Sequence, residues 1–123
     1  MQPTSLISTT DLTTILESYR FHFVTEKDLQ DGIEKALKEN GIDYQRETSI
    51  SKASRPDFLV DGIAIEVKIK GQLSGLLRQI DRYAVQDDVK SILVVGSPRW
   101  IHAIPQRLCE KEVRSLRLIG SLL

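Results

Sequence analysis

The clearest pattern in the chain is the alternation over residues 63–70, where every second residue is isoleucine or valine. A period of two predicts a β-strand with one apolar face, because successive side chains of a strand point to opposite sides. Residues 56–60 contain a shorter apolar run, and Asp61-Gly62 joins it to the alternating strand. Asp-Gly is a favoured pair for a type I′ turn, so the sequence predicts a tight β-hairpin.

Two further stretches carry apolar residues at helical spacing. Residues 25–39 begin with a capping box formed by Thr25 and Asp28, and Asn40-Gly41 is expected to end that helix. Residues 72–86 form the second predicted helix. The apolar stripes of the two helices are Leu29, Ile33, Ala36 and Leu37, and Leu76, Leu77, Ile80, Tyr83 and Ala84.

Shorter patterns complete the expected fold. They predict a helix over residues 11–19, strands over 42–50 and 91–96, a helix within 97–113 and a last edge strand within 114–120. Residues 25–123 are then one domain with the order α-β-β-β-α-β, which is an α/β fold with a mixed central sheet flanked by helices. Residues 1–24 are expected to form an N-terminal extension. Its aromatic segment, residues 19–24, either packs on the domain or contacts another subunit.

Composition limits the class of protein more than it points to a function. A chain of 123 residues, 41% hydrophobic and 28% charged, suits one globular domain. The 17 basic and 17 acidic residues cancel, so net charge does not indicate nucleic-acid binding. The one cysteine, Cys109, excludes a disulfide within the chain and a zinc cluster of thiolates. No apolar run approaches the roughly 18 residues of a membrane span and no secretory leader is evident, so we expect a cytoplasmic protein that does not bind membranes.

The charged residues of the predicted hairpin that need explaining are Asp57 on one arm, and Glu66 and Lys68 on the other. Glu66 and Lys68 are two positions apart, so they share one face of their strand. Pairing of the arms would bring Asp57 close to Glu66, and two neighbouring carboxylates repel each other unless a cation lies between them. Mg²⁺, which prefers oxygen ligands, is the expected cation, with Mn²⁺ as a substitute. The alternative is an ordinary solvated face of the sheet.

The order of these residues resembles the PD-(D/E)XK nuclease superfamily, whose fold is that of restriction-endonuclease-like domains. Pro56-Asp57 matches the PD element, and Glu66-Val67-Lys68 matches the (D/E)XK element after eight intervening residues. The resemblance covers about residues 25–96 and leaves out the first 24 and the last 27 residues. It implies that Asp57, Glu66 and the Val67 carbonyl bind the metal, and that Lys68 is catalytic.

A second resemblance lies on the predicted helix over residues 72–86. Gln79 and Tyr83 are four positions apart on one helix face, and they resemble the Q-x-x-x-Y signature of RecB-like members of the superfamily. In those members the pair lies beside the metal site and helps to hold the nucleic acid or to order the catalytic lysine. The alternative is that Tyr83 belongs to the apolar core and Gln79 to its solvent edge.

The superfamily also carries an acid on the first helix of its core, for which Glu26, Asp28 and Glu34 are candidates. At about 100° per residue, Glu26 points with the apolar stripe and Glu34 lies off it. The spacing of Glu26 and Gln30 is also similar to the start of virus-type replication-repair nuclease modules. We therefore expect Glu26 to be catalytic and to bind the metal, with Gln30 helping to bind substrate. The alternative is that Glu26 only complements the positive end of the helix.

Basic residues gather in sequence around the motif. They are Lys52, Arg55, Lys70, Arg78 and Arg82. Near a metal site they would contact phosphate groups, and Arg55, Lys70 and Arg78 are expected to bind substrate. The alternative is that they serve only solubility, which the neutral total charge leaves open.

The resemblance implies Mg²⁺-dependent hydrolysis of phosphodiester bonds in DNA, with RNA not excluded, in a phage or mobile-element enzyme or in repair or recombination. Lys68 would position the attacking water and offset the charge of the pentacovalent state. A chain this small offers little surface to DNA, so a homodimer or larger homo-oligomer is expected. The alternative is a catalytically inactive DNA-binding or assembly module of the same fold.

Overall fold

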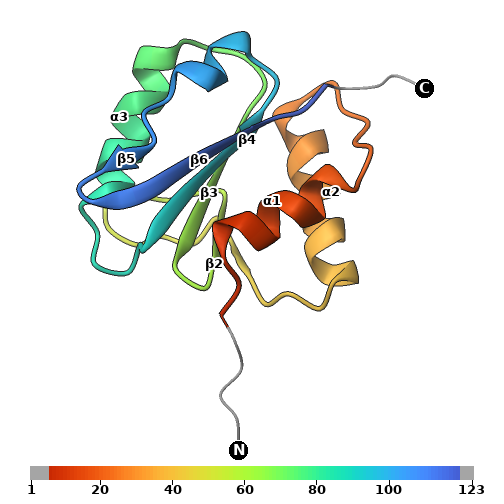
Figure 1. The fold of residues 1–123 in the computed structure, drawn as a ribbon, viewed down its shortest axis with the longest axis horizontal. Coiled ribbons are helices and arrows are strands. Elements are labelled where there is room, and N and C mark those ends of the chain that lie inside the picture. Colours follow the sequence, from red (N-terminus) through yellow and green to blue (C-terminus); the bar gives the residue numbers. More distant parts are fainter. Residues whose placement is uncertain (1–5, 120–123) are drawn as a thin grey trace, which may run out of the picture.

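The structure, a computed structural model, describes residues 6–119 and contains a mixed sheet with helices on both faces (Figure 1). The helices are α1 (Thr9–Glu17), α2 (Glu26–Glu39) and α3 (Leu73–Ala84), with a 3-10 helix, η1, over Arg99–Ala103. The strands are β1 (Gln45–Arg46), β2 (Phe58–Val60), β3 (Ile63–Lys68), β4 (Ser91–Gly96), β5 (Arg107–Leu108) and β6 (Lys111–Arg117). The expected α/β class is confirmed. No helix in this part of the chain has the length and apolar character needed to cross a membrane.

The six strands that the described residues form lie in the order β1-β2-β3-β4-β6-β5. The central neighbours β3, β4 and β6 are parallel, and the outer pairs are antiparallel. Asp61 and Gly62 join β2 to β3 with positive φ angles of 47° and 81°. A type I′ turn requires positive φ at both central residues, so the predicted tight hairpin is confirmed.

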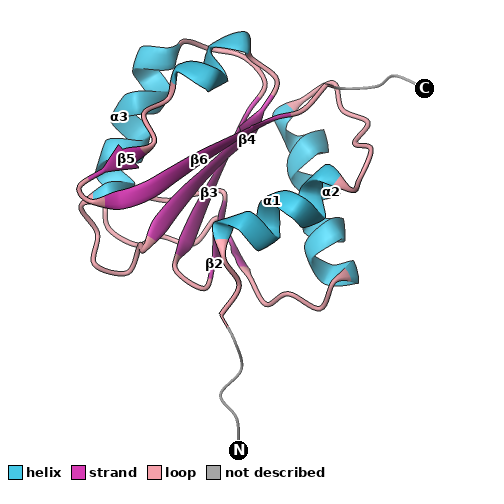
Figure 2. Cartoon of the chain, viewed as in Figure 1, coloured by secondary structure: helices cyan, strands magenta, loops and turns pink. Residues whose placement is uncertain are grey.

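Helices cover the sheet on both sides, with α1 and α2 on one face and α3 and η1 on the other (Figures 1 and 2). In β3, Ile65 and Val67 pack into the α1/α2 core, whereas Ala64 packs into the α3 core. The strand β4 contributes to both cores, which confirms that it is buried on both sides. Glu66 follows the same alternation as Ala64, so it lies on the face that α3 covers.

The N-terminal segment shares the domain core. Leu12 and Leu16 of α1 are fully buried with the apolar residues of α2. Phe21 packs on Gly32, where an added Cβ atom would lie 2.9 Å from the ring carbon Cδ1. The segment over residues 19–24 therefore packs on the domain, while its role as a subunit contact stays a prediction.

Three expectations about the secondary structure hold only in part. The strand expected over residues 42–50 is only Gln45–Arg46, because Glu47 turns the backbone to a φ of 54°. The helix expected within residues 97–113 is only the five-residue η1, since Ile104 is extended before Pro105. The last strand, β6, is not an edge strand: it pairs with β4 on one side and with β5 on the other.

Candidate functional site

The β2–β3 hairpin brings Asp57 and Glu66 together. Phe58 pairs with Ile65, and continuing this register by one residue places Asp57 opposite Glu66. Asp57 is half-buried, and its Oδ2 atom accepts a hydrogen bond of 2.7 Å from the backbone N–H of Val67. Glu66 is only 4% exposed. The hairpin therefore holds two carboxylates side by side, largely out of water.

The side chains around Glu66 come from β3 and α3. Tyr83 donates a hydrogen bond of 2.7 Å from its hydroxyl to Glu66 Oε1. The ammonium of Lys68 lies 3.7 Å from the other oxygen, Oε2. The hydroxyl of Tyr83 also lies 3.4 Å from the carbonyl oxygen of Arg55. Tyr83 is thus both a core residue, 3% exposed, and a direct partner of the candidate site.

Burial and mutual repulsion make the two carboxylates weak acids. The pKa of Glu66 is raised to about 7, first by burial and then by the charge of Asp57, although Tyr83 and Lys68 oppose the rise. The pKa of Asp57 is also raised, mainly by burial, against the Val67 hydrogen bond. Burial and the neighbouring Glu66 raise the pKa of Tyr83, so its hydroxyl keeps the proton that it donates. A cation bound between the carboxylates would reverse the shift of Glu66.

The helix α2 directs two of its polar residues toward the hairpin. Glu26 accepts a hydrogen bond of 3.4 Å from the backbone N–H of Ile69, just beyond β3. Gln30, one turn later, donates from Nε2 to Asp57 Oδ1 at 3.1 Å. The negative charge of Glu26 contributes to the raised pKa values of Asp57 and Glu66. Glu26 is therefore close enough to influence the carboxylate pair.

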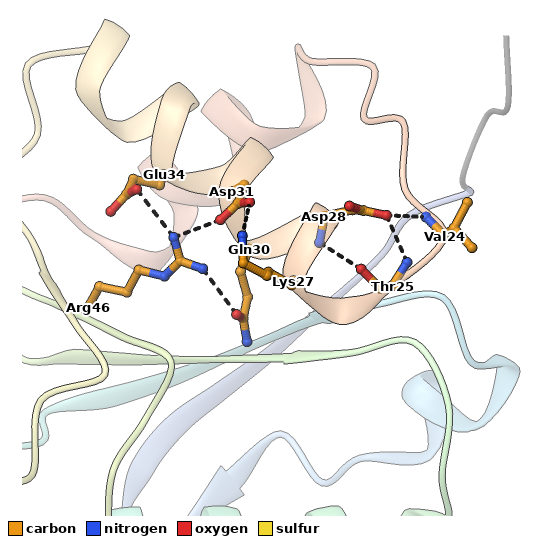
Figure 3. A network of polar contacts seen from close by, with 8 residues as sticks. All are labelled: Val24, Thr25, Lys27, Asp28, Gln30, Asp31, Glu34 and Arg46. Atoms are coloured by element: carbon orange, nitrogen blue, oxygen red, sulfur yellow. Dashed lines mark hydrogen bonds and ion pairs between the residues drawn. The ribbon is translucent and has the colours of Figure 1, made fainter.

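The other two candidate acids of α2 have different partners (Figure 3). Asp28 accepts hydrogen bonds of 3.0 Å from the backbone N–H groups of Val24 and Thr25, which completes the predicted capping box. Glu34 accepts from the guanidinium of Arg46 at 3.2 Å. The helical angle that favoured Glu26 over Glu34 thus agrees with where these two side chains lie.

Arg46 is a residue of the site region that the sequence analysis missed. Its guanidinium lies 2.9 Å from Asp31 and 3.2 Å from Glu34, and it donates to Gln30 Oε1 at 3.2 Å (Figure 3). The group also lies over the ring of Phe58, 5.6 Å from the centroid. Because Arg46 holds the oxygen of the Gln30 amide, the amide nitrogen is turned toward Asp57.

The expected substrate-binding residues separate into two groups. Gln79 and Arg55 line a cavity next to Tyr83. Lys70 and Arg78 are exposed, and in the described part of the chain no hydrogen bond or ion pair joins either of them to the carboxylates. Their expected role as phosphate contacts stays a prediction.

Gly96 is a second residue that the sequence analysis missed. It pairs with Lys68 in the parallel register of β3 and β4. A Cβ atom added at Gly96 would lie 1.8 Å from the carbonyl oxygen of Lys68, far inside van der Waals contact. Only glycine therefore fits beside the backbone that carries Lys68. The sequence feature that could have identified Gly96 is a glycine at the end of an apolar strand.

The donors at this site suit a hard cation in their chemistry. The carboxylates of Asp57, Glu66 and Glu26 offer only oxygen, and Mg²⁺ is commonly bound by one or two carboxylates together with water. Within residues 6–119, however, no group of three or more His, Cys, Asp or Glu side chains could hold a metal ion. The arrangement therefore fits a cation held by the Asp57 and Glu66 pair better than one enclosed by three acids.

No protein-family model, curated protein or solved structure matches this chain. The geometry of the carboxylate site is therefore the basis for assigning a function.

Proposed function

We propose that this chain is a metal-dependent nuclease with a restriction-endonuclease-like fold, which hydrolyses phosphodiester bonds in DNA. The observation that carries the proposal is the convergence of Asp57 and Glu66 across the hairpin, with the Lys68 ammonium 3.7 Å from Glu66. The spacing of the PD and EVK elements and the order α2-β1-β2-β3-α3-β4 support the same assignment.

In this proposal Asp57 and Glu66 hold Mg²⁺, with the Val67 carbonyl as the further donor that the resemblance implies. Glu26, which accepts a hydrogen bond from the Ile69 N–H, acts on the pair through its charge and is not a third acid at the metal. The bound cation would polarise the phosphate group and lower the pKa of a water molecule. Lys68 offsets negative charge that develops on the phosphate oxygens, because its ammonium lies at the edge of the pair.

The neighbouring groups hold the two carboxylates in place. The backbone N–H of Val67 and the amide of Gln30 each bind one oxygen of Asp57. Tyr83 binds one oxygen of Glu66, which leaves Oε2 facing Lys68. Each carboxylate oxygen retains lone pairs beyond these hydrogen bonds, so the pair can still bind a cation.

A cleavage assay tests the proposal. Purified protein with Mg²⁺ or Mn²⁺ is expected to cut DNA, assayed on supercoiled, linear and single-stranded substrates. Asp57→Ala and Lys68→Ala are each expected to lower the rate by about 100-fold or more, since each removes a group that acts on the reacting centre. Lys27→Ala is the matched control, because Lys27 is exposed on α2 and its ammonium pairs with the exposed Asp31 at 2.8 Å. Cleavage that survives in both Asp57→Ala and Lys68→Ala would show that the reaction occurs elsewhere.

A non-catalytic DNA-binding or assembly module of the same fold is the second candidate. The observation that favours it is the absence of a three-residue metal group among residues 6–119. Metal-independent DNA binding without cleavage of any substrate, by protein that is folded by circular dichroism, would support this candidate over the nuclease.

A further inference from the structure

A polar cavity of about 420 Å³ lies beside the carboxylate pair, on the α3 side of the sheet. The loop before β2 forms one wall and α3 forms the other. The lining residues are Ser49, Lys52, Ala53, Ser54, Arg55, Gln79, Arg82 and Tyr83. Because Tyr83 also donates its hydroxyl proton to Glu66, the cavity adjoins the candidate cleavage site through that one side chain.

The charge of this cavity is entirely positive. Lys52 and Arg55 come from the loop and Arg82 comes from α3, and no acid is among the lining residues. Among the ion pairs of residues 6–119, none involves any of these three cations. Three cations from two elements thus face one space without an acidic partner, which favours binding of an anion.

A buried hydroxyl in the same wall gives independent support. Ser54 is 2% exposed, and its Oγ atom has no hydrogen-bond partner in the protein. Buried polar atoms nearly always have a partner, so an unused hydroxyl suggests a ligand. The backbone around it is held, since Ile50 N–H donates to the Ser54 carbonyl at 2.9 Å and Ser54 N–H donates to the Ser51 carbonyl at 3.3 Å.

We propose that this cavity binds a phosphate group of the nucleic acid, as a second anchoring point next to the bond that is cut. The inference rests on the proposed nuclease function and names a subsite for its substrate. Guanidinium, ammonium, amide and hydroxyl groups all donate hydrogen bonds to phosphate oxygens, and arginine does so with two parallel donors. Gln79 supplies the amide among the lining groups.

Inorganic phosphate is the first probe, used with the full chain in EDTA so that metal binding does not contribute. Phosphate is expected to raise the unfolding temperature above that in chloride of equal ionic strength. The double variant Lys52→Ala/Arg82→Ala is expected to weaken phosphate binding by about tenfold or more, since two of three charge-assisted donors are removed. Lys35→Ala/Lys38→Ala, which removes the same charge from the exposed side of α2, is expected to bind as the unaltered protein does. Equal phosphate binding by both double variants would overturn the proposal.

Ser54→Ala tests the hydroxyl by itself. Loss of an unpartnered hydroxyl is expected to leave the unfolding temperature in chloride unchanged or higher, while phosphate binding weakens a few-fold. A variant with unchanged phosphate affinity would remove Ser54 from the site.

Oligonucleotides distinguish the source of the phosphate. A terminal phosphomonoester carries up to about two negative charges at neutral pH, and an internal phosphodiester carries one. If the cavity takes a terminal group, Lys52→Ala/Arg82→Ala weakens binding only of DNA with a 5′- or 3′-phosphate; if it takes an internal group, binding of hydroxyl-ended DNA weakens equally. If the double variant binds 5′-phosphorylated, 3′-phosphorylated and hydroxyl-ended DNA as tightly as the unaltered protein does, the cavity takes neither a terminal nor an internal phosphate and the proposal is wrong.

The subsite and the nuclease activity can fail separately. Asp57→Ala is expected to abolish cleavage and to retain phosphate binding. If the unaltered protein binds phosphate but cuts no DNA, the phosphate site is supported and the nuclease function is not.

Discussion

Two groups of acidic side chains lie on either side of Gln30. Basic side chains compensate the charge of one group, whereas the other group has raised pKa values. Asp31 and Glu34 lie on the outer side of α2, where Arg46 and Lys27 pair with them (Figure 3). The hydrogen bond from Lys27 and the one from Arg46 lower the pKa of Asp31. Asp31, held in this way, keeps its charge at neutral pH and has no need of a further cation.

In the inner group, Glu66 is buried and Asp57 is half-buried. Both pKa values are raised, and among residues 6–119 Lys68 is the one cationic side chain that forms an ion pair with this group, at 3.7 Å from Glu66. The two groups therefore differ in how their charge is compensated. Cations already pair with the outer acids, whereas the inner pair is stabilised by a bound proton and, in the proposed function, by a metal ion. Perturbed acids of the inner kind are typical of functional sites.

The largest effect that would sharpen this comparison is expected for Glu66→Gln. A carboxyl whose pKa is raised in the folded protein contributes stability below its unfolded pKa, and that stability is lost as pH rises through the folded pKa. In metal-free buffer the free energy of unfolding should therefore fall between about pH 4.5 and pH 7, the unfolded and folded pKa values of Glu66. Glu66→Gln keeps an oxygen for Tyr83 and removes the charge, so it should be more stable than the unaltered protein by about 3 kcal/mol at pH 8.

Urea unfolding at pH 5 and pH 8 measures this difference. Asp31→Asn, in the outer group, is the matched control and should not gain stability at pH 8, because its pKa is lowered in the folded protein. A gain in Asp31→Asn equal to that in Glu66→Gln would remove the distinction between the two groups.

Tyr83→Phe should have the next largest effect. It removes a hydrogen bond of 2.7 Å to a buried carboxylate, and hydrogen bonds to charged groups contribute about 2 kcal/mol. The loss of stability should be larger at pH 8, where Glu66 is ionised, than at pH 5. Tyr19→Phe is the control, since the Tyr19 hydroxyl accepts an exposed hydrogen bond from Asn40. Equal losses for Tyr83→Phe at the two pH values would mean that Tyr83 does not respond to the charge of Glu66.

The smallest effect on stability is expected for Arg46→Met. Methionine keeps apolar contact with Phe58 and loses three polar partners at the protein surface, so the cost should not exceed about 1 kcal/mol and should shrink in high salt. Cleavage should nevertheless slow by about tenfold, because the Gln30 amide is no longer turned toward Asp57. Lys27→Met removes only the exposed partner of Asp31 and should leave cleavage unchanged. Equal cleavage rates for the two variants would separate Gln30 from catalysis.

The inner group was largely predictable from local sequence. The Asp61-Gly62 turn and the alternation of β3 determine which residues lie opposite one another, and helical geometry was enough to separate Glu26 from Glu34. Both rules depend on neighbours within one element or one tight turn. They therefore hold before anything is known of the rest of the fold.

The outer group and the cavity were not predictable in this way. Arg46 contacts residues 12 and 16 positions earlier, so its partners depend on where the very short β1 lies against α2. The need for Gly96 appears only when β4 lies beside Lys68 in a parallel register. The unpartnered hydroxyl of Ser54 likewise depends on packing between a loop and α3. Contacts between distant segments have no periodic signal in the sequence.

The most direct test of the inner group is a calorimetric titration with Mn²⁺ at pH 8. The unaltered protein and Asp31→Asn should bind the ion with similar affinity, while Asp57→Asn and Glu66→Gln should each weaken binding by about tenfold or more, as expected when one of two carboxylate ligands is replaced by an amide. Binding of Mn²⁺ with the same affinity by all four proteins, or by none of them, would contradict the assignment of Asp57 and Glu66 as a cation site.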